Sequence, residues 1–186
     1  ILELSNGKAN INIKFVEINE HVSIENHQFY VHSQFSIETY FRFFIQKIFC
    51  NFKKVIYLDP DTIVIDDIAN LLNVDLGKNL LAATKDIDIA RGIFVKRNID
   101  DKDLISYLKQ NLNIDNIYLY FQAGVLVFNI EEMMKMNIQN RLLLKLSELG
   151  QPLYVDQDIM NSVCQRKVKL LDYSWDVLWH MYFCYP

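Results

Sequence analysis

The sequence predicts an α/β sandwich in which a mainly parallel central sheet is flanked by helices. Short apolar runs typical of buried strands alternate along the chain with segments whose apolar residues recur at helical spacing. The 186 residues include only 5 Gly and 3 Pro, and no repeat or linker-like tract divides them. We therefore expect one domain that spans residues 1–186.

The first strands and the first helix are expected in the N-terminal half. Residues 11–17 alternate between apolar and polar side chains, as in a half-buried strand. The runs at residues 55–59 (VIYLD) and 80–86 (LLAATKD) are typical of strands buried on both faces of a sheet. Apolar residues at helical spacing over residues 35–49 predict a helix with Ser36 as its N-cap.

The remaining elements complete the alternation of helices and strands. They are expected as a short helix at 66–72, a polar excursion at 91–118 with a helical patch near 101–112, a strand at 123–129, a helix at 131–149 ended by Gly150, a helix that begins within 154–164, and a last strand at 167–173.

Composition excludes several classes of protein. With 51% apolar and 23% charged residues, the chain can bury a core. A net charge of -4 without a Lys/Arg run argues against a nucleic-acid partner. Cys50, Cys164 and Cys184 lack CxxC spacing, which predicts free thiols in a reducing compartment. No stretch approaches the roughly 20 apolar residues that cross a bilayer, and no signal-peptide pattern is present, so we expect a cytoplasmic protein.

Two carboxylates follow the apolar run at residues 55–59. Asp59 and Asp61 are two positions apart, so their side chains converge if the chain stays extended. Pro60 cannot donate to a sheet ladder and marks the end of the strand, where sites in such sheets gather. Paired ionised carboxylates repel unless a cation lies between them. Hard oxygen ligands favour Mg²⁺ or Mn²⁺, which usually also bind substrate phosphates.

Two other interpretations of this stretch stay open. Asp-Pro-Asp is ordinary turn chemistry at the end of a strand. A hydrophobic strand that ends in D-x-D-x-[TV] is also similar to the nucleophile motif of haloacid-dehalogenase-like phosphatases, with Asp59 as the nucleophile. Ile63 stands where that motif has Thr or Val, and the only later acid pair, in YVDQDIM, lacks the expected glycine.

Five pieces of the chain, in order, resemble the family 8 glycosyltransferases, which include glycogenin and bacterial lipopolysaccharide galactosyl- and glucosyltransferases. They are TYFRFFI at 39–45, KVIYLDPDTIV at 54–64, LAATKD at 81–86, YFQAGVLVFNI at 120–130 and YVDQDIMN at 154–161. The resemblance implies a GT-A-type nucleotide-diphospho-sugar transferase sandwich. It implies transfer of a hexose from a UDP-sugar with retention of anomeric configuration.

The resemblance also implies a metal site and a donor site. Asp59 and Asp61 would hold Mn²⁺, with Mg²⁺ as the alternative ion, against the diphosphate. Arg42 would reach the diphosphate or a sugar hydroxyl through its fork of donors. Asp86 ends its strand at the same edge as Asp59 and would bind donor-sugar hydroxyls, although it could equally cap a helix or turn.

Two further segments complete the implied site. Gln122 stands where the family usually has Asn, and its amide is a methylene longer, so the sugar contact is expected to shift. Ala123 and Gly124 are small enough for a ligand to lie close to the backbone. Asp156 and Gln157, in the DQD segment, would act at the anomeric carbon, while Asp156 could also be an N-cap.

Two family elements are not found in the chain. They are the N-terminal strand that cradles uracil and ribose, and a C-terminal His-x-x-Gly-x-x-Lys-Pro-Trp segment. His180 has neither Gly nor Lys-Pro after it and is not assigned as a metal ligand. A missing first strand would expose a sheet edge and favour self-association.

The expected partners follow from the same resemblance. We expect a UDP-sugar donor and a glycan or lipid-linked glycan acceptor of bacterial cell-surface type, which would bring the protein to the inner face of the membrane. A non-catalytic GT-A-like binding domain is the alternative to an active enzyme.

Overall fold

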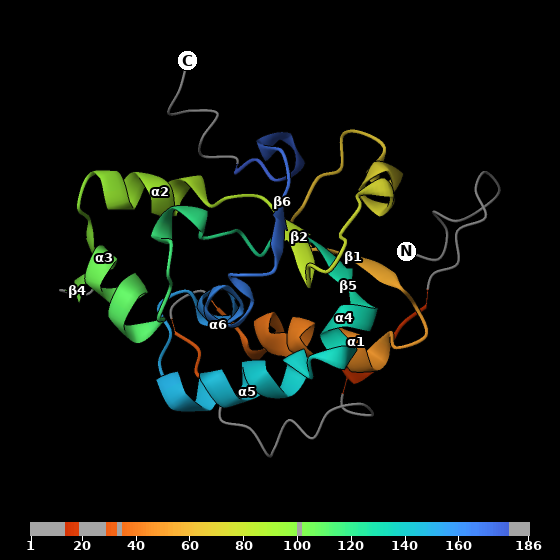
Figure 1. The fold of residues 1–186 in the computed structure, drawn as a ribbon, viewed down its shortest axis with the longest axis horizontal. Helices are drawn as coiled ribbons and strands as arrows, with labels where there is room; N and C mark the ends of the chain where they lie inside the picture. The colour runs from red at the N-terminus through yellow and green to blue at the C-terminus, as the bar shows by residue number, and fades with distance from the viewer. Residues whose placement is uncertain (1–13, 19–28, 33–34, 100–101, 179–186) are drawn as a thin grey trace.

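A central sheet covered by helices organises the chain (Figure 1). The computed structural model describes residues 14–18, 29–32, 35–99 and 102–178. Residues 11–13, His180 and Cys184 lie outside this part. Among the described residues the sheet has four strands in the order β1-β5-β2-β6. Their bounds are β1 Lys54–Leu58, β2 Leu81–Ala83, β5 Val125–Asn129 and β6 Val168–Leu170.

The directions of the strands confirm the α/β class and refine it. β2 and β6 pair in parallel, with Leu81 opposite Val168. β5 lies between β1 and β2 and runs antiparallel to both, with Lys54 opposite Asn129 and Leu81 opposite Phe128. Strands β1, β2 and β6 therefore point the same way and β5 is reversed. An apolar run predicts a buried strand, but it carries no information on direction.

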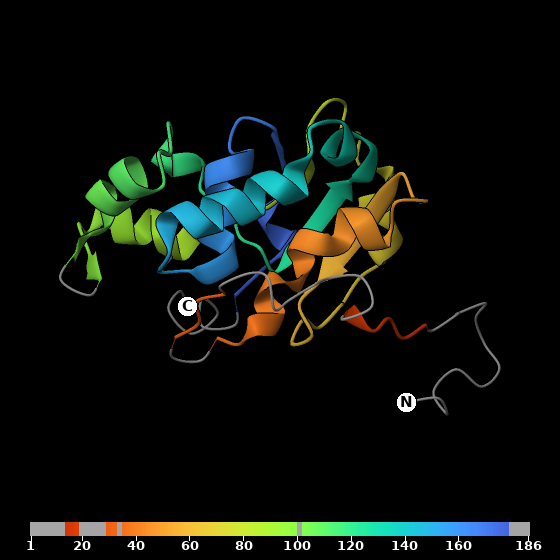
Figure 2. The ribbon, with the colours of Figure 1, turned by 90° about the horizontal axis from the view of Figure 1, so that it is seen from below.

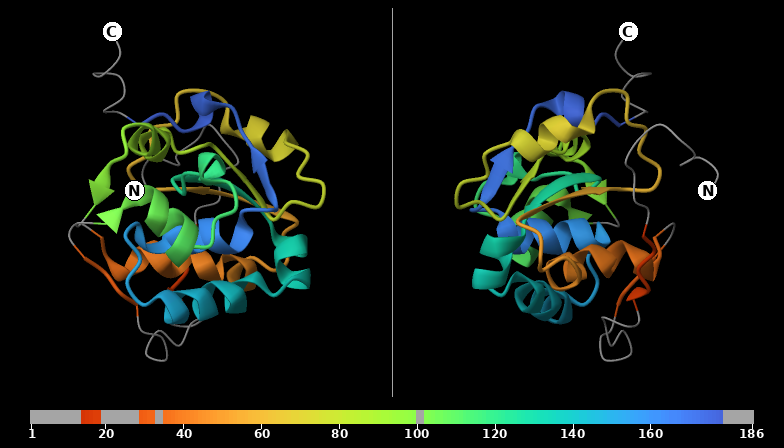
Figure 3. Two further views of the ribbon diagram at one scale, coloured as in Figure 1. Left: turned by 60° about the vertical axis from the view of Figure 1, so that its left-hand side comes forward. Right: turned by 90° about the vertical axis from the view of Figure 1, so that its right-hand side faces the viewer.

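Both faces of β2 and β5 are buried and β1 is half-buried along its length, which explains why these three strands read as continuous apolar runs. Leu126 and Phe128 of β5 belong to one core cluster, and Val125 and Val127 belong to another on the opposite face. The first face packs against η4, α4, α5 and α6, which lie together in Figure 2, and the second packs against η5 and η8 (Figure 3). β1 alternates in the same way, and its Val55 and Tyr57 lie on the first face, which packs against η4, α4, α5 and α6.

The helix predicted over residues 35–49 is present but tighter than expected. It consists of the 3₁₀ helix η4 (Ile37–Phe44) followed by the short α-helix α1 (Ile45–Ile48). Ser36 occupies the N-cap position but makes no capping hydrogen bond with its side chain. The buried face of η4 includes Tyr40 and Phe43, which pack into the sheet.

The prediction of a single helix over residues 131–149 is wrong, because the chain forms two helices there. They are α4 (Ile130–Lys135) and α5 (Ile138–Leu149). Asn137 between them has φ 50°, in the left-handed region that Asn tolerates and a continuous α-helix does not allow. The apolar stripe continues through the break, so the sequence pattern did not reveal it. Gly150 ends α5 with φ 73°, as predicted.

The polar excursion at 91–118 is more ordered than predicted. It contains part of α2 (Ile87–Phe94), which the sequence analysis missed, and its other elements are β3 (Asn98–Ile99), β4 (Lys102–Asp103), α3 (Leu104–Ser106), a π-helical turn (Tyr107–Asn111) and η7 (Ile117–Leu119). Ile89, Leu104, Leu108 and Tyr120 form a separate core cluster there. The polar residues therefore cover a small core of their own.

The short helix predicted at 66–72 and the helix within 154–164 are confirmed, the strand predicted at 167–173 is shorter than expected, and η8 was not predicted. Described residues 14–17 form no strand, so the strand predicted at 11–17 is wrong over that part. The other elements are η5 (Ile68–Asn73), capped by Asp67, α6 (Val155–Cys164) and η8 (Tyr173–Trp175). In the described part of the chain, no helix has the length and apolar character to cross a membrane.

Candidate active site

A pocket of about 650 Å³ opens where β1 ends and β5 begins. These antiparallel strands bring Asp59 and Gly124 together, and the Asp59 N–H donates to the Gly124 carbonyl at 2.9 Å. The pocket is lined by eight of the nine predicted site residues, namely Arg42, Asp59, Asp61, Gln122, Ala123, Gly124, Asp156 and Gln157. Asp86 is the exception, and Asp176 is an added acidic residue that the sequence analysis missed.

The chain turns between the two paired aspartates, so the turn interpretation of this stretch holds and the chain does not stay extended there. The Thr62 N–H donates to the Asp59 carbonyl at 3.0 Å, which closes a turn over residues 59–62. Asp59 is partly buried at the end of β1, whereas Asp61 is exposed on the turn. Both side chains still line the same pocket. The turn and the site are therefore compatible interpretations of one stretch.

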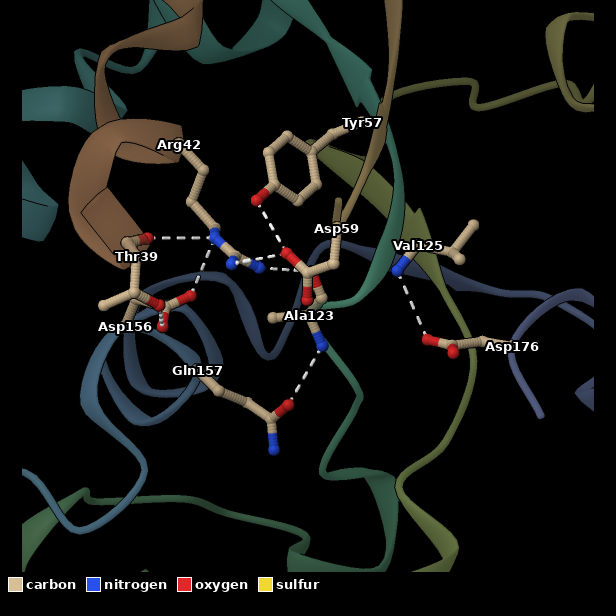
Figure 4. Close-up of polar contacts among 9 residues, drawn as sticks. All are labelled: Thr39, Arg42, Tyr57, Asp59, Ala123, Val125, Asp156, Gln157 and Asp176. Atoms are coloured by element: carbon tan, nitrogen blue, oxygen red, sulfur yellow. Dashed lines mark hydrogen bonds and ion pairs between the residues drawn. The ribbon is translucent and has the colours of Figure 1, made fainter. Parts of the chain in front are cut away.

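Arg42 is the buried centre of the site and not a solvent-exposed residue of its helix. Its side chain is 5% exposed, and Nη2 lies 2.8 Å from Asp59 Oδ1 (Figure 4). Its Nε–H donates to the Thr39 carbonyl at 3.0 Å, and Nη1 donates to the Ala123 carbonyl. Burial opposes its charge, but Asp156, Tyr57 and Asp59 together raise the pKa of Arg42 above its ordinary value. Arg42 is therefore a fixed cation in the pocket wall.

Tyr57 belongs to the same cluster and was not predicted. Its hydroxyl donates to Asp59 Oδ1 at 2.7 Å, and its ring centroid lies 4.5 Å from the guanidinium carbon of Arg42. Burial raises the pKa of Tyr57 despite the opposing effect of Arg42, so the hydroxyl remains a donor. Its position two residues before Asp59 on β1 was the signal in the sequence, because alternate strand residues share a face.

Asp156 lies in the first turn of α6 and faces the pocket. Tyr154, not Asp156, is the N-cap of that helix. The Thr39 hydroxyl donates to Asp156 Oδ1, and Oδ2 lies 2.9 Å from Arg42 Nε as an ion pair. Among the described residues, Oδ2 accepts no hydrogen bond. Burial raises the pKa of Asp156 to about 6, although Arg42 and Thr39 act in the opposite direction.

The raised pKa of Asp156 predicts how stability depends on pH. Its pKa is about 6 in the folded chain and about 3.9 in an unfolded one. Between these values the folded state binds more protons at Asp156, so the contribution of Asp156 to the free energy of unfolding falls as pH rises and levels off about one unit above pH 6. We expect Asp156→Asn to remove roughly 2 kcal/mol of this pH dependence. Urea denaturation of both proteins from pH 4 to pH 7 measures it, and parallel curves would contradict the assignment.

Gln157 ties three parts of the site together. Its Oε1 accepts from the Ala123 N–H at 3.0 Å, and its Nε2 donates to Asp86 Oδ2 at 2.9 Å. Asp86 caps α2 by accepting from the Ile89 N–H at 2.8 Å, so both of its oxygens are engaged. Burial raises the pKa of Asp86, against these two hydrogen bonds. The cap interpretation of Asp86 is therefore confirmed, and Asp86 reaches the pocket through Gln157.

The segment before β5 gives the pocket a polar amide and an open backbone. Gln122 is buried, and no described residue hydrogen-bonds its side-chain amide. A Cβ on Gly124 would lie 3.3 Å from Asp176 Oδ2 and 3.5 Å from Asp59 Oδ2. Asp176 accepts from the Val125 N–H at 3.2 Å, and burial raises its pKa to about 6. Glycine at 124 therefore keeps the space between two carboxylates clear.

The side chains that line the pocket could bind a small divalent cation only if a phosphate supplied further ligands. In the part of the chain that the structure describes, no three His, Cys, Asp or Glu side chains are arranged to hold a metal ion. Asp59 and Asp61 nevertheless share one pocket, and Oδ2 of Asp59 faces the space left clear by Gly124. Mg²⁺ and similar ions are commonly bound by one or two carboxylates plus substrate phosphates, which is the donor set available here.

The fold and the pocket at its sheet edge define the class of protein. The chain has the GT-A fold, since it superposes on solved glycosyltransferases of that fold. The WbbM bifunctional glycosyltransferase gives a TM-score of 0.70 at 34% identity, over 81% of this chain and 30% of that one. The galactosyltransferase LgtC, solved with donor and acceptor sugar analogs, gives 0.60 at 29% identity, over 75% and 46%.

The family follows from the sequence comparison. The model of glycosyl transferase family 8 matches residues 3–184, and the chain belongs to that family. Glycosyltransferase 8 domain-containing protein 1 of Xenopus laevis is 33% identical over 112 residues, which cover 56% of this chain and 31% of that protein. The resemblance that the sequence predicted is therefore confirmed. Family membership argues against the phosphatase alternative with Asp59 as nucleophile.

The chain is short beside these relatives. It spans between 31% and 38% of the length of the curated relatives that it matches.

Proposed function

We propose that the chain carries the donor site of a retaining glycosyltransferase that moves a hexose from a UDP-sugar to a glycan acceptor. The observation that carries this proposal is the buried Arg42, which lies between Asp59 and Asp156 in the wall of one pocket. Arg42 thus holds Asp59, which is suited to a cation, and Asp156, which is suited to the sugar, on either side of one guanidinium. The complex of LgtC with donor and acceptor sugar analogs supports two sugar partners in the family.

Asp59 and Asp61 would hold Mn²⁺, or Mg²⁺, together with oxygens of the donor diphosphate. When bound there, the ion supplies a Lewis acid for the negative charge that collects on UDP as the sugar–phosphate bond breaks. Arg42 adds a permanent positive charge beside Asp59, because its pKa is raised. Such a preorganised charge stabilises a leaving group without any rearrangement during the reaction.

The donor sugar would lie against the segment that precedes β5. The amide of Gln122 supplies donors and an acceptor for hydroxyl groups, and Gly124 allows the sugar to approach the backbone. Direct contact between Asp86 and the sugar stays a prediction. In the present arrangement Asp86 orients Gln157, whose side chain lines the pocket.

Retention requires the new bond to form on the face from which UDP departs. Either an enzyme nucleophile forms a covalent intermediate first, or the acceptor attacks the same face of a short-lived ion pair. Asp156 is suited to both routes, since it is ionised above pH 6 and could attack or stabilise an oxocarbenium-like carbon. Gln157 holds the pocket wall beside it through both ends of its amide.

The acceptor and the place of action follow from the family resemblance. We propose a lipid-linked or cell-surface glycan of bacterial type as the acceptor, and a cytoplasmic protein that acts at the inner face of the membrane. A non-catalytic domain that only binds the sugar nucleotide would share the donor site. Hydrolysis of the UDP-sugar, or transfer from it, separates an enzyme from such a binding domain.

The first test is calorimetric titration of the chain with UDP, in Mn²⁺ and then in EDTA. We expect binding in Mn²⁺, no binding in EDTA, and no binding by Asp59→Asn/Asp61→Asn. The matched control is Asp66→Asn/Asp75→Asn, which removes the same charge from two exposed aspartates outside the pocket. The control should bind as the wild type does.

Two outcomes would count against the proposal. Binding of UDP that is equal in Mn²⁺ and EDTA would remove the role of the paired aspartates. Absence of UDP binding by the wild-type chain under both conditions, with its fold verified by circular dichroism, would contradict the donor site itself.

A further inference from the structure

The two carboxylate oxygens of Asp59 have different surroundings. Oδ1 accepts from the Tyr57 hydroxyl at 2.7 Å and lies 2.8 Å from Arg42 Nη2. Oδ2 accepts from no described residue and lies on the side of Gly124, where a Cβ would come within 3.5 Å of it. Figure 4 shows both donors approaching Asp59 from the helix side of β1. Asp59 therefore offers a single oxygen to the pocket.

Tyr57 is held firmly enough to fix this arrangement. Its ring contacts both the guanidinium carbon of Arg42, 4.5 Å from the ring centroid, and the Phe128 ring, whose centroid is 6.5 Å away in an edge contact. Its backbone belongs to β1, with Leu126 as the partner on β5. The hydroxyl is thus positioned by the guanidinium, an aromatic neighbour and the sheet, and it holds the Asp59 carboxylate through its hydrogen bond.

The number of oxygens that Asp59 offers affects the choice of cation. Mg²⁺ and Mn²⁺ are small and take six ligands in an octahedron, which suits a carboxylate bound through one oxygen. Ca²⁺ accepts six to eight oxygens and readily binds both oxygens of one carboxylate. A hydrogen-bond donor that occupies one carboxylate oxygen thus disfavours Ca²⁺.

We propose that Tyr57 is a positioning residue that, with Arg42, confines Asp59 to one-oxygen coordination and so selects a small octahedral cation over Ca²⁺. The inference rests on the proposed function, in which Asp59 binds a metal with UDP. It assigns to Tyr57 a role in the choice of metal that is separate from the stability of the strand.

Tyr57→Phe tests the proposal, because it removes the hydroxyl and keeps the ring contacts with Arg42 and Phe128. The Kd values of Mn²⁺ and Ca²⁺ are measured at saturating UDP, with Mn²⁺ followed by electron paramagnetic resonance and Ca²⁺ by competition. We expect the Kd of Mn²⁺ to rise about tenfold, while that of Ca²⁺ stays constant or falls. The preference for Mn²⁺ over Ca²⁺ then drops at least as much.

Tyr40→Phe is the matched control. The Tyr40 hydroxyl donates to the Tyr30 carbonyl at 2.7 Å and does not touch Asp59. Its loss should leave the ratio of the two Kd values unchanged, even if stability falls. A Tyr57→Phe ratio equal to that of the wild type would overturn the inference and leave the proposed function standing. A wild-type chain that binds neither ion with UDP would overturn both.

Discussion

Replacing Arg42 by methionine is expected to lower the free energy of unfolding by about 3–5 kcal/mol at pH 8. Methionine fills a similar length of the buried space but leaves Asp156 without its ion pair at 2.9 Å. It also removes the donors to the Ala123 carbonyl and to Asp59. Uncompensated burial of a carboxylate is among the largest effects that one substitution produces.

The loss should be smaller at pH 5 than at pH 8. Asp156 has a pKa of about 6, so at pH 5 it is largely protonated, and the neutral acid needs no cation. Urea denaturation at both pH values measures the difference. Arg166→Met is the control, because the ion pair of Arg166 with Asp115 is exposed and is expected to contribute nothing measurable. Equal losses at the two pH values would show that Arg42 acts through packing alone.

The same substitution is expected to abolish UDP binding that depends on Mn²⁺. Arg42 both positions Asp59 and supplies charge beside the proposed diphosphate site. Arg42→Lys keeps a charge but loses the planar fork that contacts Thr39, Ala123 and Asp59 together. Compared with Arg42→Met, the lysine variant should therefore recover part of the lost stability and a smaller part of the lost UDP binding. Full recovery of UDP binding by lysine would indicate that charge alone matters at this position.

The sequence revealed the strands better than it revealed their arrangement. The apolar runs that became β1, β2 and β5 stand out because side chains on both faces of these strands pack in core clusters. The reversal of β5 depends on pairing between residues as distant as Lys54 and Asn129, which no local pattern encodes. The break at Asn137 was hidden for a related reason, since the apolar stripe continues from α4 into α5.

The residues of the candidate site also fall into those that a local sequence pattern reveals and those that it does not. Asp59 and Asp61 were visible because polar residues that follow an apolar strand are unusual enough to mark a site or a turn. Tyr57 was overlooked, although it lies two residues before Asp59 on the same face of the strand, because an aromatic residue in an apolar run normally packs in the core. Asp176 was missed because its approach to Gly124 depends on how the chain after β6 returns to β5. Residues brought together by tertiary contacts leave no such local signal.

Asp158 shows that neighbouring acids of one motif can have unrelated roles. The DQD segment was expected to lie beneath the sugar, yet α6 turns Asp158 away from the pocket into complete burial. It accepts from the hydroxyls of Tyr107, at 2.6 Å, and Tyr120, at 2.7 Å, and from the Tyr154 N–H at 2.8 Å. These contacts join α6 to the separate core that contains Tyr107 and Tyr120.

Asp158→Ala is expected to lower the free energy of unfolding by about 3–4 kcal/mol, because it leaves buried donors without their acceptor and opens a small cavity. Chemical denaturation measures this loss. The matched control is Asp103→Ala, which removes an exposed aspartate that caps α3 through the Ser106 N–H and should cost far less.

The same variant separates the fold from the chemistry of the site. Below its unfolding temperature, Asp158→Ala should bind UDP in Mn²⁺ as the wild type does, because Asp158 does not line the pocket. Asp156→Asn should have the opposite effect: the chain stays folded, but it no longer transfers the sugar or hydrolyses the UDP-sugar. Asp156 lies two positions before Asp158 and faces the pocket. A folded Asp158→Ala protein without UDP binding would place Asp158 in the site after all. An unchanged stability would mean that the two tyrosines find other partners.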